Sequence, residues 1–427
     1  MSKIIAFDFA SSGIRALAAE VLSNNTVRIF SEENRKAEAI CNGVLEHPSG
    51  TAYSVPALFK ELYNSSGVRN LPSTFSVSLG GKGFRIVKAS VEKKLNKSKI
   101  ITEEIIDKMA EECEKSYIRD GLFVYEVIPV MYEVDGVTHE SPEGLKGNYI
   151  TGNYHLVVGS DKVKYNLDKC MERIGNHEVD CMPLSADAFS FVVSTEDERN
   201  QGCAVINLGD TSTTLAIYRD ELLQHLLVVP LGGRNITIDI EELGISDEKA
   251  EKLKRIKGVA MESMVDKPIN IKIPSKHIES EHVVVSSKLL AQIVEARLEE
   301  IFYHIFDTLS VNEKEIPGGI ILTGGGANLT GIREFVEQKS GISTRYGDHS
   351  GWLTEDTSEH FRDARYSQII GTILLTKLSK EVQMQPEIIE VGKTKKKSGK
   401  RRSLREKITQ GFFRFFEDDT ELQTSAG

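Results

Sequence analysis

Two short segments, far apart in the chain, share a pattern that could bind phosphate groups. Residues 3–20 read KIIAFDFASSGIRALAAE, and residues 202–219 read GCAVINLGDTSTTLAIYR. In each, an apolar run ends near an acid or amide (Asp8, Asn207), a small residue follows (Ala10, Gly209), and hydroxyl residues fill a turn before a second strand-like run. Small residues allow close backbone approach, and their N–H groups can point into one concave space. Either segment alone could be an ordinary hairpin, but a matching pair could hold a polyphosphate between them.

Two glycine-rich segments could complete such a site. Residues 318–332, GGIILTGGGANLTGI, predict a strand, a turn at Gly324–Gly326 and a helix after Asn328, and this backbone could lie against a flat ligand or a phosphate. Residues 228–240, VVPLGGRNITIDI, place Gly232 and Gly233 before a helix that begins near Asn235 and Thr237. Three-glycine turns alone are weak evidence, because glycine also serves ordinary tight turns.

A charged helix is expected directly after these glycines. Residues 246–258 read SDEKAEKLKRIKG, with Ser246 placed as the N-cap. Glu251 and Lys254 lie three residues apart and therefore share a face of this helix. They could form a solvated ion pair or hold a ribose.

Length and composition limit the class of protein. The chain has 427 residues, about three times a typical domain. Its 40% hydrophobic and 27% charged residues fit a folded globular protein. We find no run of 18 apolar residues and no secretory signal pattern, and the five cysteines form no Cys-x-x-Cys pair, so we expect reduced thiols rather than a zinc site.

Charge is distributed unevenly along the chain. The net charge is −10, yet residues 391–427 carry ten Lys/Arg and five Asp/Glu, which leaves −15 on the preceding 390 residues. The negative total argues against a general nucleic-acid binder. A basic tail on an acidic body predicts that the tail meets an anionic surface.

The C-terminal tail contains an amphipathic segment, SLREKITQGFFRFF (403–416), after a linker. Ser403 and Glu406 have capping-box spacing. At 100° per residue, most large apolar side chains fall in one arc of about 120°, which suits a helix lying in a membrane surface, and a helix docked on its own protein is the alternative. The candidate membrane residues are Leu404, Ile408, Phe412, Phe415 and Phe416 on the arc and Phe413 beside it.

The four phosphate- and glycine-rich elements, in this order, resemble the actin, sugar-kinase and heat-shock-chaperone superfamily. Five further segments resemble the FtsA family of actin-like bacterial cell-division proteins: YEVIPVMYEVDG (125–136), PEGLKG (142–147), NYHLVV (153–158), LAQIVEARLEEI (290–301) and ARYSQIIGTILL (364–375). The resemblance implies an α/β fold of actin type, with two lobes, a duplicated α/β core, an FtsA-type insert subdomain and a C-terminal amphipathic helix.

The resemblance also implies a division of the chain. The first lobe takes residues 1–83 and 161–200, with the insert at 84–160. The second-lobe core takes 201–231, its upper subdomain 232–302, and the rest of that core with the return to the first lobe 303–380. A basic linker (381–402) and a membrane-targeting helix (403–417) follow.

In the family, ATP lies in the cleft between the lobes, and its contacts carry over residue by residue. They are Ser11, Ser12 and Gly13 in the first hairpin, Gly209, Asp210, Thr211, Ser212 and Thr213 in the second, Gly232 and Gly233 near the phosphates, Glu251 and Lys254 at the ribose, and Gly324, Gly325, Gly326 and Asn328 at the adenine. Mg²⁺ would be held through water by Asp8 and Asn207.

Several positions depart from the family pattern. Ala10 replaces a glycine, Gly13 a frequently basic residue, Asn207 and Thr214 two aspartates, and Thr211 a glycine, while Asp210 is an extra acid. Asn207 cannot carry the charge that orients water around Mg²⁺. We therefore expect nucleotide binding with weak or absent hydrolysis.

The resemblance implies several partners. The upper subdomain of the second lobe would bind the C-terminal peptide of the tubulin-like protein FtsZ at Arg297 and Glu300, which could equally be a surface ion pair. The insert, with a predicted core face at Ile105, Met109, Cys113 and Tyr117, would contact neighbouring subunits of a filament and other division proteins. The protein would then act at the division site, on the cytoplasmic side of the membrane, with its tail on anionic lipids.

Three other functions remain open on the sequence. A small-molecule kinase needs a carboxylate base near its acceptor, and Asn207 and Thr214 stand where one would be expected. A chaperone needs a further substrate-binding domain. A pilus-assembly adaptor of the same superfamily typically lacks a membrane tail.

Overall fold

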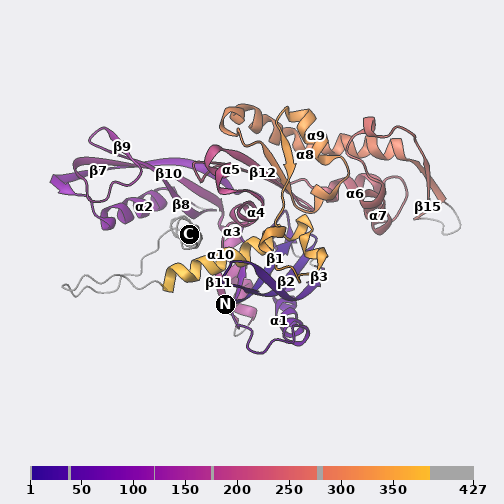
Figure 1. The fold of residues 1–427 in the computed structure, drawn as a ribbon, viewed down its shortest axis with the longest axis horizontal. Coiled ribbons are helices and arrows are strands. Elements are labelled where there is room, and N and C mark those ends of the chain that lie inside the picture. The colour runs from indigo at the N-terminus through magenta and orange to yellow at the C-terminus, as the bar shows by residue number, and fades with distance from the viewer. Residues whose placement is uncertain (1, 37–39, 120, 175–176, 277–281, 385–427) are drawn as a thin grey trace, which may run out of the picture.

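The computed structural model describes residues 2–36, 40–119, 121–174, 177–276 and 282–384. The tail predicted to form a linker and a membrane helix lies outside these residues. Figure 1 shows an elongated molecule with the insert at one end, the β15–β16 hairpin at the other, and two sheet-based lobes between them. None of the described helices is long and apolar enough to cross a membrane.

The two lobes are built on sheets of the same design. In each, three antiparallel strands are followed by two parallel ones, in the orders β3-β2-β1-β6-β11 and β14-β13-β12-β17-β18. The first sheet comprises β1 (Ser2–Ala10), β2 (Gly13–Val21), β3 (Val27–Arg35), β6 (Phe75–Val77) and β11 (Val179–Cys181). The second comprises β12 (Cys203–Leu208), β13 (Thr213–Arg219), β14 (Leu222–Val229), β17 (Ile320–Thr323) and β18 (Thr344–Tyr346). The repeated pattern in the sequence therefore reflects a duplicated core.

Helices cover the sheets and join the lobes. The apolar residues of β1 and β2 are buried because α1 (Pro48–Ser65) and α10 (Ser367–Met384) pack against this sheet. Between the lobes, α10 lies against α4 (Ser185–Val193), and one continuous core runs from the first sheet through these helices to β12 and β13. The remaining helices of this region are α3 (Asp161–Ile174) and α5 (Glu196–Gln201).

The insert has its own small core. Its sheet, in the order β7-β10-β8-β9, is covered on one face by α2 (Glu103–Tyr117). Ile105, Met109 and Cys113 are buried against this sheet, and Tyr117 is partly buried beside them, as the helical spacing predicted. The strands are β7 (Arg85–Ile100), β8 (Leu122–Val134), β9 (Val137–His139) and β10 (Lys146–Ser160).

A second core lies between the other face of the second-lobe sheet and the helices of that lobe. There the long α8 packs against α6, α9 and strand β16. The elements are α6 (Gly233–Glu241), α7 (Asp247–Lys257), β15 (Asn270–Pro274), β16 (His282–Ser286), α8 (Ser287–Asn312) and α9 (Ile332–Ser340). The short 3-10 helices in the described part of the chain are Glu262–Met264, Glu313–Glu315, Gly325–Asn328, Ser350–Trp352, Glu359–Arg362 and Ala364–Tyr366.

Of three predicted helix starts, the structure confirms Ser246 as the N-cap of α7 and shifts the other two. Helix α6 begins at Gly233, because the Asn235 side chain accepts the Gly232 N–H (3.0 Å) and closes the first turn. Ser246 is the N-cap residue of α7, although its side chain makes no capping bond. The helix expected directly after Asn328 begins only at Ile332, because a 3-10 turn ends at Asn328 and Gly331 has a left-handed φ of 81°.

Candidate functional site

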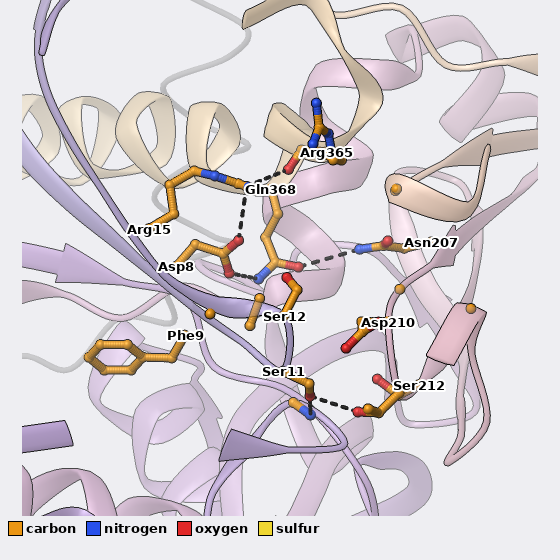
Figure 2. A pocket seen from close by; sticks show the side chains of 18 of the residues that line it. Asp8, Phe9, Ser11, Ser12, Arg15, Asn207, Asp210, Ser212, Arg365 and Gln368 are labelled. Atoms are coloured by element: carbon orange, nitrogen blue, oxygen red, sulfur yellow. Dashed lines mark hydrogen bonds and ion pairs between the residues drawn. The ribbon is translucent and has the colours of Figure 1, made fainter. Parts of the chain in front are cut away.

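A cleft of about 760 Å³ lies where the two hairpins face each other. One wall comes from the β1–β2 turn and the other from the β12–β13 turn (Figure 2). The glycine turn after β17, the start of α6 and one face of α7 complete it. Of the predicted nucleotide residues, those that line the cleft are Ser11, Ser12, Gly13, Gly209, Asp210, Thr211, Ser212, Gly233, Glu251, Lys254, Gly324, Gly325, Gly326 and Asn328.

The two hairpins touch each other at one end of the cleft. The Thr211 hydroxyl donates to the Ser11 hydroxyl at 2.7 Å. A third turn joins this contact, because the Asn42 N–H donates to Thr211 (2.9 Å) and the Gly43 N–H to Ser11 (3.4 Å). This third turn, Asn42–Gly43, belongs to a small hairpin formed by β4 (Ile40–Cys41) and β5 (Val44–Leu45).

Gln368, at the start of α10, bridges the predicted metal residues. Its amide nitrogen donates to Asp8 Oδ1 at 3.0 Å, and its oxygen accepts from Asn207 Nδ2 at 3.4 Å (Figure 2). Arg15 Nη1 lies 3.6 Å from Asp8 Oδ2. Burial raises the pKa of the Asp8 carboxyl, and Arg15 and Gln368 partly offset this rise.

These contacts test whether Mg²⁺ fits the predicted pair. The Asp8 carboxylate is the kind of hard oxygen ligand that a hydrated Mg²⁺ uses beside phosphates. Asn207 instead turns its NH₂ group toward Gln368, and its oxygen faces Gly324 so closely that a Cβ there would lie 2.2 Å away. Asp8 therefore fits a magnesium–phosphate complex, whereas Asn207 presents a donor to the same space.

Asp210 directs its carboxylate into the cleft, between the two hairpins (Figure 2). Desolvation raises the pKa of this carboxyl, and the nearby Lys254 ammonium lowers it only in part. The backbone around it is held tightly: its own C=O accepts the Arg234 N–H at 2.6 Å, and the Gly209 C=O accepts the Gly233 N–H at 2.9 Å.

Glu251 and Lys254 form the predicted pair on α7, with 2.6 Å between Lys254 Nζ and Glu251 Oε2. Lys254 also donates to the Gly233 carbonyl and to the Thr237 hydroxyl, each at 2.8 Å. The Lys254 side chain is 12% exposed, whereas that of Glu251 is 40% exposed. The pair is thus anchored on α6, with Glu251 the more accessible member.

The glycine turn after β17 lies against the second hairpin. Gly324 has a φ of 86°, and a Cβ at Gly326 would lie 2.3 Å from the Leu208 side chain, so both positions require glycine. Asn328 donates to Asp363 at 3.0 Å, and Asp363 in turn pairs with Arg365 at 2.9 Å.

Two predicted nucleotide residues do not line the cleft. The buried Thr213 hydroxyl donates to the Leu231 carbonyl at 2.8 Å and so supports the wall from behind. Gly232 packs on the loop, where a Cβ would lie 2.6 Å from the Asp210 carbonyl. Both residues shape the site without facing it.

Sequence reasoning missed several lining residues. Arg15 pairs with Asp8 directly across the β1–β2 hairpin, so the register of that hairpin could have identified it. Gln368 is contributed by a helix 360 positions after Asp8, and no local pattern marks it. Other missed lining residues include Glu32, Arg35, Lys36, Gly43, Ser78, Arg255, Asp363, Arg365 and Tyr366.

The predicted partner residues lie on α8, away from the cleft lining. Arg297 makes a two-pronged ion pair with Asp239 of α6, both distances being 2.6 Å. It also pairs with Glu300, whose side chain is 58% exposed. Hydrogen bonds and charge from Asp239 raise the pKa of Arg297 further. Arg297 thus links α6 to α8, and Glu300 is the more accessible of the two.

Comparison with known proteins decides the family. A family model described as cell division protein FtsA matches residues 204–371, and a model of the SHS2 domain inserted in FtsA matches residues 81–158. The chain belongs to the FtsA family. The FtsA of Borreliella burgdorferi is 26% identical over 381 residues, covering 87% of this chain and 90% of that protein. The FtsA of Bacillus subtilis is 27% identical over 341 residues, covering 78% and 76%.

Solved structures confirm the predicted fold class. The PilM–PilN type IV pilus biogenesis complex aligns with a TM-score of 0.62 at 12% identity, over 88% of this chain and 98% of that one. MreB5 of Spiroplasma citri bound to ADP aligns with a TM-score of 0.55 at 12% identity, over 90% and 99%. The FtsA-family chain therefore has an actin-like fold with the FtsA insert.

Proposed function

We propose that this protein is an actin-like cell-division adaptor that binds ATP, polymerises on the inner face of the cytoplasmic membrane and tethers FtsZ filaments there. The observation that carries the proposal is the joining, in one chain, of an FtsA-family body to a basic tail with an amphipathic pattern at residues 403–416. The body would supply the polymer and the partner surface, and the tail the membrane contact.

The interlobe cleft supports ATP binding. Its walls are two turns of small and hydroxyl residues, whose geometry suits a polyphosphate. Lys254 adds a fixed positive charge, and Glu251 is exposed enough to accept a ribose hydroxyl. MreB5 structures bound to ADP and to AMPPNP share the fold. Mg²⁺ held through water at Asp8 would neutralise part of the phosphate charge.

The amino-acid sequence of the tail supports reversible membrane binding. Each fully buried aromatic or aliphatic side chain contributes roughly 1.5–3 kcal/mol. Each Lys or Arg near an anionic leaflet adds about 1 kcal/mol. Because one tail binds weakly, a polymer carrying many tails would hold the membrane far more tightly than a single subunit.

The surface around Arg297 is our proposed contact for the FtsZ C-terminal peptide. Arginine suits an acidic, partly apolar peptide because its planar group can form two parallel hydrogen bonds with a carboxylate. Arg297 already forms two such hydrogen bonds with Asp239. An incoming carboxylate would therefore contact the other edge of the Arg297 guanidinium, beside Glu300. The filament contacts of the insert and its contacts with other division proteins belong to the same proposal.

Co-sedimentation with anionic vesicles tests the membrane part. We expect the full chain to pellet with the vesicles, and chains that end at residue 390 or carry Phe412→Glu and Phe415→Glu to stay in solution. A phenylalanine of the body's surface serves as control: Phe123→Glu, which is only partly buried in the insert, should leave pelleting unchanged. Equal pelleting of all forms would refute the tail as the anchor.

A further inference from the structure

The small hairpin formed by β4 and β5 closes the phosphate end of the cleft. It follows β3 and reads ICNGVL over residues 40–45. Its two turn residues have left-handed backbones, with φ of 51° at Asn42 and 73° at Gly43. Asn-Gly with two positive φ values is the favoured two-residue turn of a hairpin.

The N–H groups of this turn point out of the hairpin. In a two-residue turn, neither central N–H takes part in the strand ladder, so each needs another partner. Here the partners are the hydroxyls of the two facing hairpins: Asn42 donates to Thr211 at 2.9 Å, and Gly43 to Ser11 at 3.4 Å. Three loops therefore meet in one small hydrogen-bonded ring, which the 2.7 Å contact between Thr211 and Ser11 completes.

This ring has spare hydrogen-bonding capacity for an anion. Ser11 accepts from both Thr211 and Gly43, so its own O–H remains available to donate. The two backbone N–H groups form bonds with neutral hydroxyls, and bonds to a phosphate oxygen would be about twice as strong. An inserted phosphate oxygen would thus be preferred over the present partners.

The turn cannot retreat when a ligand arrives. A Cβ at Gly81 would lie 2.6 Å from the Asn42 carbonyl, and that carbonyl accepts the Lys82 N–H at 3.0 Å. A Cβ at Gly43 would lie 3.0 Å from the Gly81 Cα. The turn is therefore a fixed end wall, and a phosphate entering the ring must part Ser11 from Thr211.

We propose that the Asn42–Gly43 turn is a third phosphate-facing element, whose two N–H groups receive the terminal phosphate and make the cleft select nucleoside triphosphate over diphosphate. This inference rests on the proposed nucleotide binding. A diphosphate, held by the two hairpins, leaves the ring closed. A triphosphate opens it and gains the bonds of the end wall.

Isothermal titration of the full chain with ATP and with ADP tests the proposal. Gly43→Ala strains a left-handed backbone and pushes the turn against Gly81, so we expect ATP affinity to fall about tenfold, the loss of one bond to a charged group, and ADP affinity to change less than twofold. Gly67→Ala is the matched control, because Gly67 has a φ of 63° with nothing within 4 Å of an added Cβ. It should change neither affinity.

Other outcomes distinguish a failure of selection by the turn from a failure of nucleotide binding. Equal losses of ATP and ADP affinity in Gly43→Ala would overturn selection by the turn while leaving nucleotide binding standing. A wild-type chain that binds neither nucleotide would overturn both. Should Gly43→Ala fail to fold, amide hydrogen exchange of wild-type residues 40–45 decides: we expect protection by AMPPNP beyond that by ADP, and equal protection would refute the proposal.

Discussion

At the scale of single residues, Asp210 places in the cleft a carboxylate whose charge is only partly compensated. Its carboxylate points between the hairpins, and no hydrogen bond to it is found among the described residues. Desolvation raises the pKa of the carboxyl above its ordinary value, which means that folding favours the protonated form. The charged form therefore costs stability at neutral pH.

We expect Asp210→Asn to stabilise the free protein at pH 7. The native state holds the Asp210 proton more tightly than the unfolded state does. The loss of wild-type stability caused by the charged carboxylate is therefore absent below the pKa that Asp210 has in the unfolded state, and fully present above its raised pKa in the native state. The gain in melting temperature should thus shrink as the pH falls toward 4. Differential scanning calorimetry between pH 4 and 8 measures this gain, and Asp266→Asn, at an exposed position, serves as the control. A gain in melting temperature that is absent or independent of pH would contradict the prediction.

Arg297 yields a second prediction at this scale. Arg297→Glu should weaken binding of an FtsZ C-terminal peptide about tenfold or more, because a carboxylate would then face the acidic peptide. Fluorescence anisotropy measures the dissociation constant. Lys339→Glu breaks a comparable ion pair with Glu299 on another side of α8 and should leave binding unchanged.

The Arg297→Glu experiment also needs a measurement of stability. Removing Arg297 also leaves Asp239 without its ion pair, which could disturb the packing of α6 on α8. The melting temperature of each variant must therefore be compared. An unaltered dissociation constant in a folded Arg297→Glu protein would remove Arg297 from the partner surface.

At the scale of elements, α10 connects the two lobes. Its first turn carries Gln368, which touches both lobes in the cleft, and its last residues precede the tail. It approaches α4 so closely that a Cβ at Gly371 would lie 1.7 Å from the Ala188 carbonyl. Because this obstruction is backbone, it cannot be relieved by a rotamer change.

Gly371→Ala should therefore destabilise the protein by about 1–3 kcal/mol, the usual cost of overpacking. Urea denaturation followed by circular dichroism provides the measurement. Gly351→Ala is the matched control, because nothing lies within 4 Å of an added Cβ there. Equal stability of Gly371→Ala and the wild type would contradict a tight α4–α10 contact at this position.

Local sequence patterns predicted some elements and missed others for physical reasons. The duplicated hairpins were predictable because strand, small turn and strand are adjacent in sequence. The Asn42–Gly43 hairpin was also predictable, since Asn-Gly between apolar residues is a strong hairpin signal, yet it was overlooked. Gln368 could not be predicted, because it meets Asp8 only through the tertiary packing of α10.

At the scale of the whole molecule, the charge distribution complements the architecture. The first 390 residues carry −15 and the tail +5, so an anionic membrane would repel the body and attract the tail. We expect added salt to weaken recruitment of the full chain, because exposed charges are screened within about 10 Å at 0.1 M. Vesicle co-sedimentation across salt concentrations would show this, and recruitment insensitive to salt would indicate a purely apolar anchor.

Recruitment of fluorescent FtsZ filaments to a supported anionic bilayer tests the adaptor function most directly. With ATP and the full chain, we expect FtsZ fluorescence on the bilayer. Ending the chain at residue 390 should abolish it, and Arg297→Glu should reduce it while this protein itself remains on the membrane. Absence of FtsZ recruitment by a full chain that is bound to the bilayer would contradict the proposed function, as would equal recruitment by the truncated chain.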